Sequence, residues 1–72
     1  MLVDDDAELR ELIPTYLGQQ GFDVSAVEDG VAMDVWLERD TPDLIILDLM
    51  LPGEDGLSIA KRLKASRDIP II

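Results

Sequence analysis

The feature that most restricts the fold of this chain is the uninterrupted apolar run Leu44–Leu47, which ends at an acid, Asp48. The run reads Leu-Ile-Ile-Leu and has no polar residue to face water, which is typical of a central strand buried on both faces of a parallel sheet. Parallel strands are joined by crossover segments, usually helices. The run therefore predicts an α/β fold in which helices cover the sheet.

The rest of the chain alternates in the way that such a fold requires. Strands are predicted at Met1–Asp4, Phe22–Val27, Asp43–Leu47 and Ile69–Ile72. Helical spacing of apolar residues follows each of the first three strands, at Leu9, Leu12, Ile13, Tyr16 and Leu17, at Met33, Trp36 and Leu37, and at Leu57, Ala60 and Leu63. Pro14 should interrupt or kink the first helix, because it lacks a backbone donor. The order β-α-β-α-β-α-β with short turns predicts a parallel sheet with right-handed crossovers.

Composition excludes several classes of function. The chain has 72 residues and neither Cys nor His, so it is one domain at most, without disulfides, thiolate metal sites, a histidine base or a phosphohistidine donor. A net charge of −10 argues against direct nucleic-acid binding, which needs clusters of Lys and Arg. No segment approaches the ~20 apolar residues that span a bilayer. We therefore expect a cytoplasmic protein with no membrane partner.

Acidic residues follow two of the predicted strands directly, as Asp4–Asp6 and as Asp48. If these strands are parallel neighbours, their carboxyl ends bring Asp4, Asp5 and Asp48 into one crevice, where open parallel sheets bind ligands. No Lys, Arg or His stands beside them in the sequence, so the cluster needs a raised pKa or a cation. A hard divalent cation is the simplest answer. Asp6 is better explained as a helix cap; Asp4 and Asp5 could also be caps, but the presence of Asp48 favours a metal role.

The residues and their spacing resemble a known family, the receiver domain of two-component response regulators. The resemblance rests on five segments: Val3–Asp6, Gly21–Val24, Pro42–Gly53, Asp55–Gly56 and Ile69–Ile72. The sequence Leu-Asp-Leu-Met-Leu-Pro-Gly at 47–53 is similar to the OmpR/PhoB subclass, whose members carry a C-terminal winged-helix domain. The resemblance implies a flavodoxin-like (CheY-like) parallel sheet with alternating helices and strand order 2-1-3-4, as a segment of the family's (βα)5 unit.

The resemblance also implies a site and partners. Asp48 would be the phosphoacceptor, with Mg²⁺ held by Asp4, Asp5, Asp48 and the backbone carbonyl of Met50. An Asp carboxylate is already ionised at pH 7 and needs no general base, which agrees with the absence of His. The implied partners are a sensor histidine kinase, possibly a second copy in a homodimer, and DNA only through a C-terminal output domain outside this chain. Such a domain is a signalling module and is not counted as an enzyme.

Residues 1–72 are expected to be a partial receiver domain. By the family pattern the chain stops inside strand four, before the Thr or Ser that follows that strand and the Lys that ends strand five. An alternative is therefore a structural or interaction fragment that pairs with another chain and is not phosphorylated. A third candidate is a Mg²⁺-dependent phosphohydrolase with an aspartyl-phosphate intermediate. That class usually has a second acid two residues after the nucleophile, where this chain has Met50.

Overall fold

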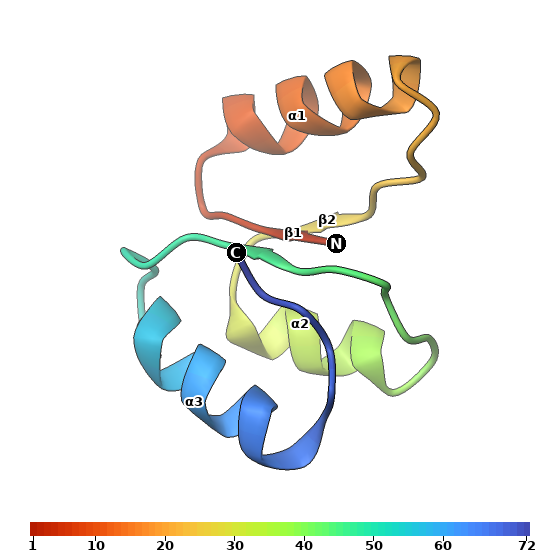
Figure 1. Ribbon diagram of the computed structural model, residues 1–72. Helices are drawn as coiled ribbons and strands as arrows, with labels where there is room; N and C mark the ends of the chain where they lie inside the picture. The colour runs from red at the N-terminus through yellow and green to blue at the C-terminus, as the bar shows by residue number, and fades with distance from the viewer.

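A parallel three-stranded sheet forms the centre of the computed structural model, which describes residues 1–72 (Figure 1). The first strand, β1 (Leu2–Val3), lies between β2 (Ala26–Val27) and β3 (Ile46–Leu47). Leu2 pairs with Ala26 on one side and with Ile46 on the other. The predicted parallel α/β fold and the order 2-1-3 are confirmed.

The segment predicted as strand four lies beside β3 but forms only an isolated parallel bridge, between Ile45 and Ile71. Three backbone hydrogen bonds support it. The N–H of Ile45 donates to the carbonyl of Pro70 at 2.9 Å, that of Leu47 donates to Ile72 at 3.0 Å, and that of Ile72 donates to Ile45 at 2.9 Å. The predicted strands at 22–27 and 43–47 are likewise too long, because the strands of the sheet cover only Ala26–Val27 and Ile46–Leu47. Phe22, which suggested the earlier start of the second strand, is 63% exposed.

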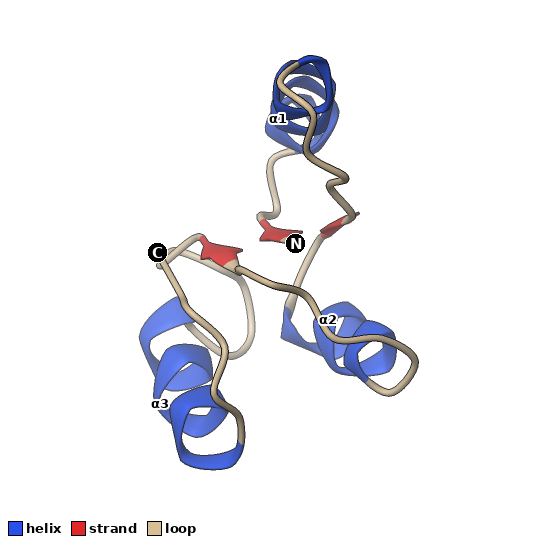
Figure 2. Ribbon diagram, turned by 45° about the vertical axis from the view of Figure 1, so that its right-hand side comes forward, coloured by secondary structure: helices blue, strands red, loops and turns tan.

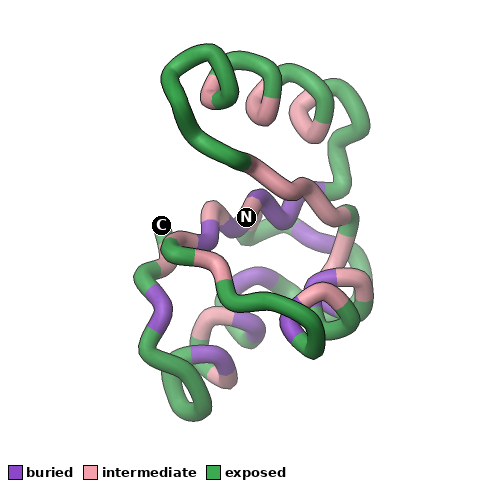
Figure 3. The backbone as a smooth tube through the Cα atoms, turned by 90° about the vertical axis from the view of Figure 1, so that its right-hand side faces the viewer, coloured by how far each residue is buried: buried purple, intermediate pink, exposed green.

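The helices lie on both faces of the sheet (Figure 2). Helix α1 (Ala7–Gln19) covers one face, and α2 (Gly30–Leu37) and α3 (Gly56–Ser66) cover the other. The main core fills the space between the sheet and the α2–α3 layer, and its buried segments follow the strands and the inner turns of these helices (Figure 3). Its members are Val3, Met33, Leu37, Ile45, Leu47, Leu51, Ile59, Leu63 and Ile69.

Helix α1 is the less buried layer, since none of its residues is fully buried. Leu9, Ile13 and Leu17 are half-buried, whereas Leu12 and Tyr16 are 62% and 60% exposed. Only the i, i+4, i+8 row of the predicted stripe therefore faces the sheet.

The ends of α1 explain how it forms around a proline. Asp6 is the N-cap, and its Oδ1 accepts the N–H groups of Glu8 at 2.9 Å and Leu9 at 3.3 Å. At the other end, Gly21 has a φ of 93°, a conformation that glycine adopts without strain. The prediction that Pro14 interrupts α1 is wrong. A proline removes one backbone hydrogen bond, and the remaining turns and both caps keep the helix continuous.

The inward face of α3 also differs from the prediction. Leu57 is 57% exposed, and the residues that face the core are Gly56, Ile59 and Leu63. Because the helix begins at Gly56 with this residue against the sheet, the buried row runs i, i+3, i+7 from Gly56. In α2, Met33 and Leu37 of the predicted apolar spacing lie in the core, and the partly buried Trp36 packs against it.

Candidate functional site

The three predicted acids meet at one edge of the sheet. Asp4, Asp5 and Asp48 each offer a carboxylate oxygen, and these oxygens lie within 4.8 Å of one another. Val3 is paired with Leu47 in the ladder, so the residues that follow them leave parallel neighbouring strands side by side. Backbone bonds hold both positions: the N–H of Asp4 donates to Val27 and that of Asp48 donates to Val3, each at 3.0 Å. The geometry predicted from the sequence is thus present.

The local backbone orients two of the carboxylates. Asp4 is only 9% exposed, and its Oδ1 accepts the N–H of Asp6 at 2.9 Å. Asp48 is half-buried, and its Oδ1 accepts the N–H of Met50 at 3.0 Å. Each of these acids keeps its other oxygen free of protein partners, and Asp5 is exposed with both oxygens free. The site therefore has carboxylate oxygens available to an external ligand.

No cationic side chain neutralises the cluster. Both ion pairs in the structure are made by Arg62 with other acids. Arg10, which the sequence reasoning did not consider, does approach the site, but its Nη1 donates to the backbone carbonyl of Asp4 at 3.1 Å and not to a carboxylate. Arg10 follows Asp6 by four residues, about one helical turn, and this spacing could have indicated that its side chain lies near the acids. The three carboxylates therefore form no ion pair within the protein.

The donor set fits Mg²⁺. This hard cation prefers carboxylate and carbonyl oxygens at about 2.1 Å, so two opposite ligands lie about 4.2 Å apart. Adjacent ligands of such an ion lie about 3.0 Å apart, so the three carboxylate oxygens, which lie within 4.8 Å of one another, have to close further around a bound ion. The side chain of Met50 is 83% exposed, and the role of its backbone carbonyl as a ligand stays a prediction.

Gly56 is a residue whose importance the sequence did not show. A Cβ atom placed on it would lie 2.1 Å from the carbonyl oxygen of Asp48 and 2.6 Å from the Cα of Leu49. The start of α3 therefore packs directly against the backbone that carries Asp48. Close backbone approach of this kind leaves no mark in a single sequence, where Gly56 looks like any turn or helix-start glycine.

Two acids that precede Gly56 have structural roles in the loop. Asp55 is the N-cap of α3, and its Oδ1 accepts the N–H of Ser58 at 2.8 Å. This hydrogen bond lowers the pKa of the Asp55 carboxyl group. Glu54 is paired with Arg62 at 2.9 Å.

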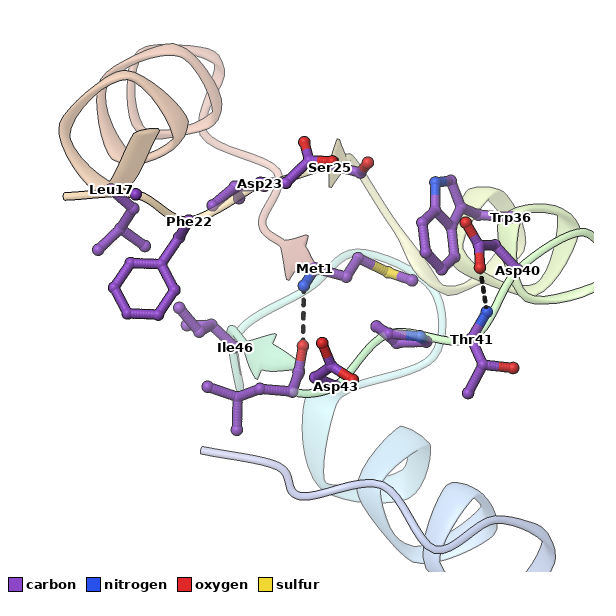
Figure 4. A pocket seen from close by; sticks show the side chains of 14 residues that line it. Met1, Leu17, Phe22, Asp23, Ser25, Trp36, Asp40, Thr41, Asp43 and Ile46 are labelled. Atoms are coloured by element: carbon purple, nitrogen blue, oxygen red, sulfur yellow. Dashed lines mark hydrogen bonds between the residues drawn. The ribbon is translucent and has the colours of Figure 1, made fainter. Parts of the chain in front are cut away.

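A hollow of about 530 Å³ lies at the other edge of the sheet and contains none of the three acids (Figure 4). Phe22 and Trp36 line it, and the residues that precede the strands form its floor. There the amino group of Met1 donates to the carbonyl of Leu44 at 2.8 Å. The candidate site is thus defined by converging carboxylates at an open edge and not by a cavity.

Comparison with known proteins agrees with this geometry. The sequence pattern of the response regulator receiver domain matches residues 1–72. The chain belongs to this family. Its relatives include the DNA-binding response regulator MtrA from Mycobacterium leprae and from Mycolicibacterium paratuberculosis, each 39% identical over the full 72 residues. The chain spans about a third, 32%, of the length of these relatives. The predicted family is confirmed, and these relatives are DNA-binding regulators, as are members of the OmpR/PhoB subclass.

Solved receiver structures share the fold. The receiver domain of RstA from Klebsiella pneumoniae, described as BeF3-activated, is 38% identical with a TM-score of 0.90, covering 97% of this chain and 60% of that one. TrrA from Thermotoga maritima, in complex with Mg²⁺-BeF, is 32% identical with a TM-score of 0.87, covering 97% and 62%. The receiver fold predicted for this chain is confirmed.

None of the helices in this receiver segment has both the length and the apolar character needed to cross a membrane.

Proposed function

We propose that this receiver segment accepts a phosphoryl group from a sensor histidine kinase onto Asp48, with Mg²⁺ bound by Asp4, Asp5, Asp48 and the backbone carbonyl of Met50. The observation that carries the proposal is the convergence of three carboxylates, without a cationic side chain, at the carboxyl edge of the sheet. The Mg²⁺-BeF complex of TrrA supports the same chemistry for the family.

The residues present suit an in-line transfer. A carboxylate oxygen of Asp48 forms the new bond to phosphorus while the bond from phosphorus to the donor breaks, and the electron pair of that bond leaves with the donor. Asp48 is ionised at neutral pH and needs no base. When bound, Mg²⁺ would offset the repulsion between this carboxylate and the phosphoryl oxygens. The hydrogen bond from the N–H of Met50 holds the Asp48 carboxylate in one orientation.

The output is proposed to lie outside the chain. MtrA is by name a DNA-binding regulator, whereas the net charge of −10 makes DNA contact by this segment unfavourable. We therefore propose that residues 1–72 are part of a cytoplasmic receiver domain that controls a C-terminal DNA-binding domain, with a homodimer as a further proposed partner state. The coverage of 60–62% of two solved receiver chains supports the assignment of a partial domain.

Phosphorylation of the whole protein that carries this chain tests the proposal. With acetyl phosphate and Mg²⁺, the parent protein should gain one hydroxylamine-labile phosphoryl group, and Asp48→Asn should gain none. Asp6→Asn is the matched control, since Asn also caps helices and Asp6 binds the backbone of α1. Label retained on Asp48→Asn would refute the role of Asp48. Absence of label on every protein would favour the alternative of an interaction segment that pairs with another chain.

A further inference from the structure

Arg62, on α3, makes the densest set of side-chain hydrogen bonds in the protein. Its Nε–H is shared by the two carboxylate oxygens of Glu54, at 3.0 and 2.9 Å. Its Nη1 and Nη2 donate to Oδ1 and Oδ2 of Asp34, at 2.9 and 3.0 Å. One guanidinium therefore connects α3, α2 and the loop 48–55 that follows β3.

This loop begins at the candidate phosphoacceptor and ends at the cap of α3. Its other side-chain hydrogen bonds are local, from Met50 to Asp48 and from Ser58 to Asp55. The pair between Glu54 and Arg62 is its only side-chain hydrogen bond to a residue more than three positions away. The loop also turns through Gly53, with a φ of 76°. Leu51 anchors the middle of the loop in the core, and Arg62 is the one long-range polar tether of its side chains.

The tether differs from an ordinary surface ion pair, which contributes little because solvent screens it. The guanidinium is bound by two carboxylates at once. Its two parallel hydrogen bonds to Asp34 form a bidentate pair, which fixes both the position and the plane of the guanidinium. The hydrogen bonds to Glu54 and then to Asp34 raise the pKa of Arg62 above its usual range. The pair also lies over the buried Gly30, where a Cβ would come within 3.4 Å of Glu54 and 3.5 Å of Arg62.

We propose that Arg62 is a positioning residue of the phosphoacceptor site: by holding Glu54, it fixes loop 48–55 so that the backbone of Met50 stays in place beside Asp48 for Mg²⁺ binding. The inference rests on the proposed function, because it assigns a control of the same site. Metal ligands need such outer support, since a loose ligand binds weakly even when it is present.

Because Arg62 is positively charged, electrostatics and positioning predict opposite changes in Mg²⁺ affinity when it is replaced. Arg62→Met removes a positive charge from an acidic protein, so electrostatics alone predicts tighter Mg²⁺ binding. Loss of positioning predicts weaker binding. We expect Arg62→Met and Glu54→Gln to raise the Kd for Mg²⁺ by about threefold or more, below the 10–100-fold typical of partners that touch a ligand directly. Isothermal titration calorimetry on the whole protein measures this, and urea unfolding without Mg²⁺ gives the stability of each variant.

Asp34→Asn is the matched control, because it weakens the other ion pair of Arg62 without changing a residue of loop 48–55. It should lower stability to a similar extent as Glu54→Gln while leaving the Kd for Mg²⁺ within about twofold of the parent value. Unchanged or tighter Mg²⁺ binding by Arg62→Met would overturn the positioning role and leave a stabilising ion pair. If the parent protein itself binds Mg²⁺ no better than its Asp5→Asn variant, the proposed metal site fails, and this inference fails with it.

Discussion

Gly56→Ala should distort the candidate site through backbone packing alone. The new methyl group would lie 2.1 Å from the carbonyl oxygen and 2.9 Å from the carbonyl carbon of Asp48. Ordinary contacts are 3.4 Å or longer, so the start of α3 and the end of β3 must move apart by about 1 Å in a region that is packed like a crystal. The atoms that must move are backbone atoms, and no side-chain rotation can relieve the overlap.

The cost can be estimated from two opposing effects. Overpacking of this kind typically costs about 1–3 kcal/mol. Alanine in a helix gains at most about 1 kcal/mol over glycine, and less in the first turn. We therefore expect a net fall in the free energy of unfolding of about 0.5–2.5 kcal/mol. The Tm falls by about 4–8 °C for each kcal/mol in a domain of this size. Since Asp48 is displaced, Mg²⁺ binding should weaken as well.

Urea unfolding and Mg²⁺ titration of the whole protein check both effects. Gly18→Ala is the control, because a Cβ on Gly18 in α1 meets nothing within 4 Å. That variant should be as stable as the parent or more stable, by up to about 1 kcal/mol. A Gly56→Ala protein that unfolds at the parent's urea midpoint and binds Mg²⁺ equally well would show that the close approach of α3 to Asp48 does not exist in solution.

Two further predictions concern charge. Millimolar Mg²⁺ should raise the thermal midpoint of the parent, because a ligand at ten times its Kd stabilises by about 1.4 kcal/mol, whereas an equal rise in Asp5→Ala would place the ion elsewhere. Asp55 has a pKa lowered from 3.8 in the folded state, so its contribution to stability is present above pH 3.8 and is lost as the pH falls through the lowered pKa. Asp55→Asn keeps a capping side chain but has no carboxyl group to titrate. Between pH 5 and pH 3 its urea midpoint should therefore fall less than that of the parent. An equal fall in both proteins would contradict a contribution of Asp55 to the pH dependence of stability.

The fold and the acid cluster were predictable because both depend on patterns that a single sequence carries. The apolar run at 44–47 marks the central strand, and an acid directly after such a run has to appear at the carboxyl edge. The same reasoning placed Asp4 beside Asp48, since parallel neighbours end at the same edge. Their convergence needed no knowledge of side-chain packing.

The remaining features depend on distances between segments, which periodicity does not encode. Gly56 looks like a turn residue in the sequence, and only the packing of α3 against Asp48 shows why no larger residue fits. The tether from Arg62 to Glu54 and Asp34 joins residues that are 8 and 28 positions away. The prediction for Pro14 was wrong because a local rule ignored the hydrogen bonds that surround it in α1.

The acids of this protein differ in which groups offset their negative charge. Three acids bind the N–H groups at the starts of helices, where the helix dipole favours negative charge; these are Asp6, Asp29 and Asp55. Two more, Glu54 and Asp34, share the one guanidinium that forms ion pairs. Two of the three acids at the carboxyl edge, Asp4 and Asp48, also bind a neighbouring N–H. None of the three forms an ion pair, and their oxygens lie within 4.8 Å of one another. A divalent cation bound at this edge would offset the repulsion between the three carboxylates, and this is why we place the proposed Mg²⁺ here and not elsewhere on the acidic surface.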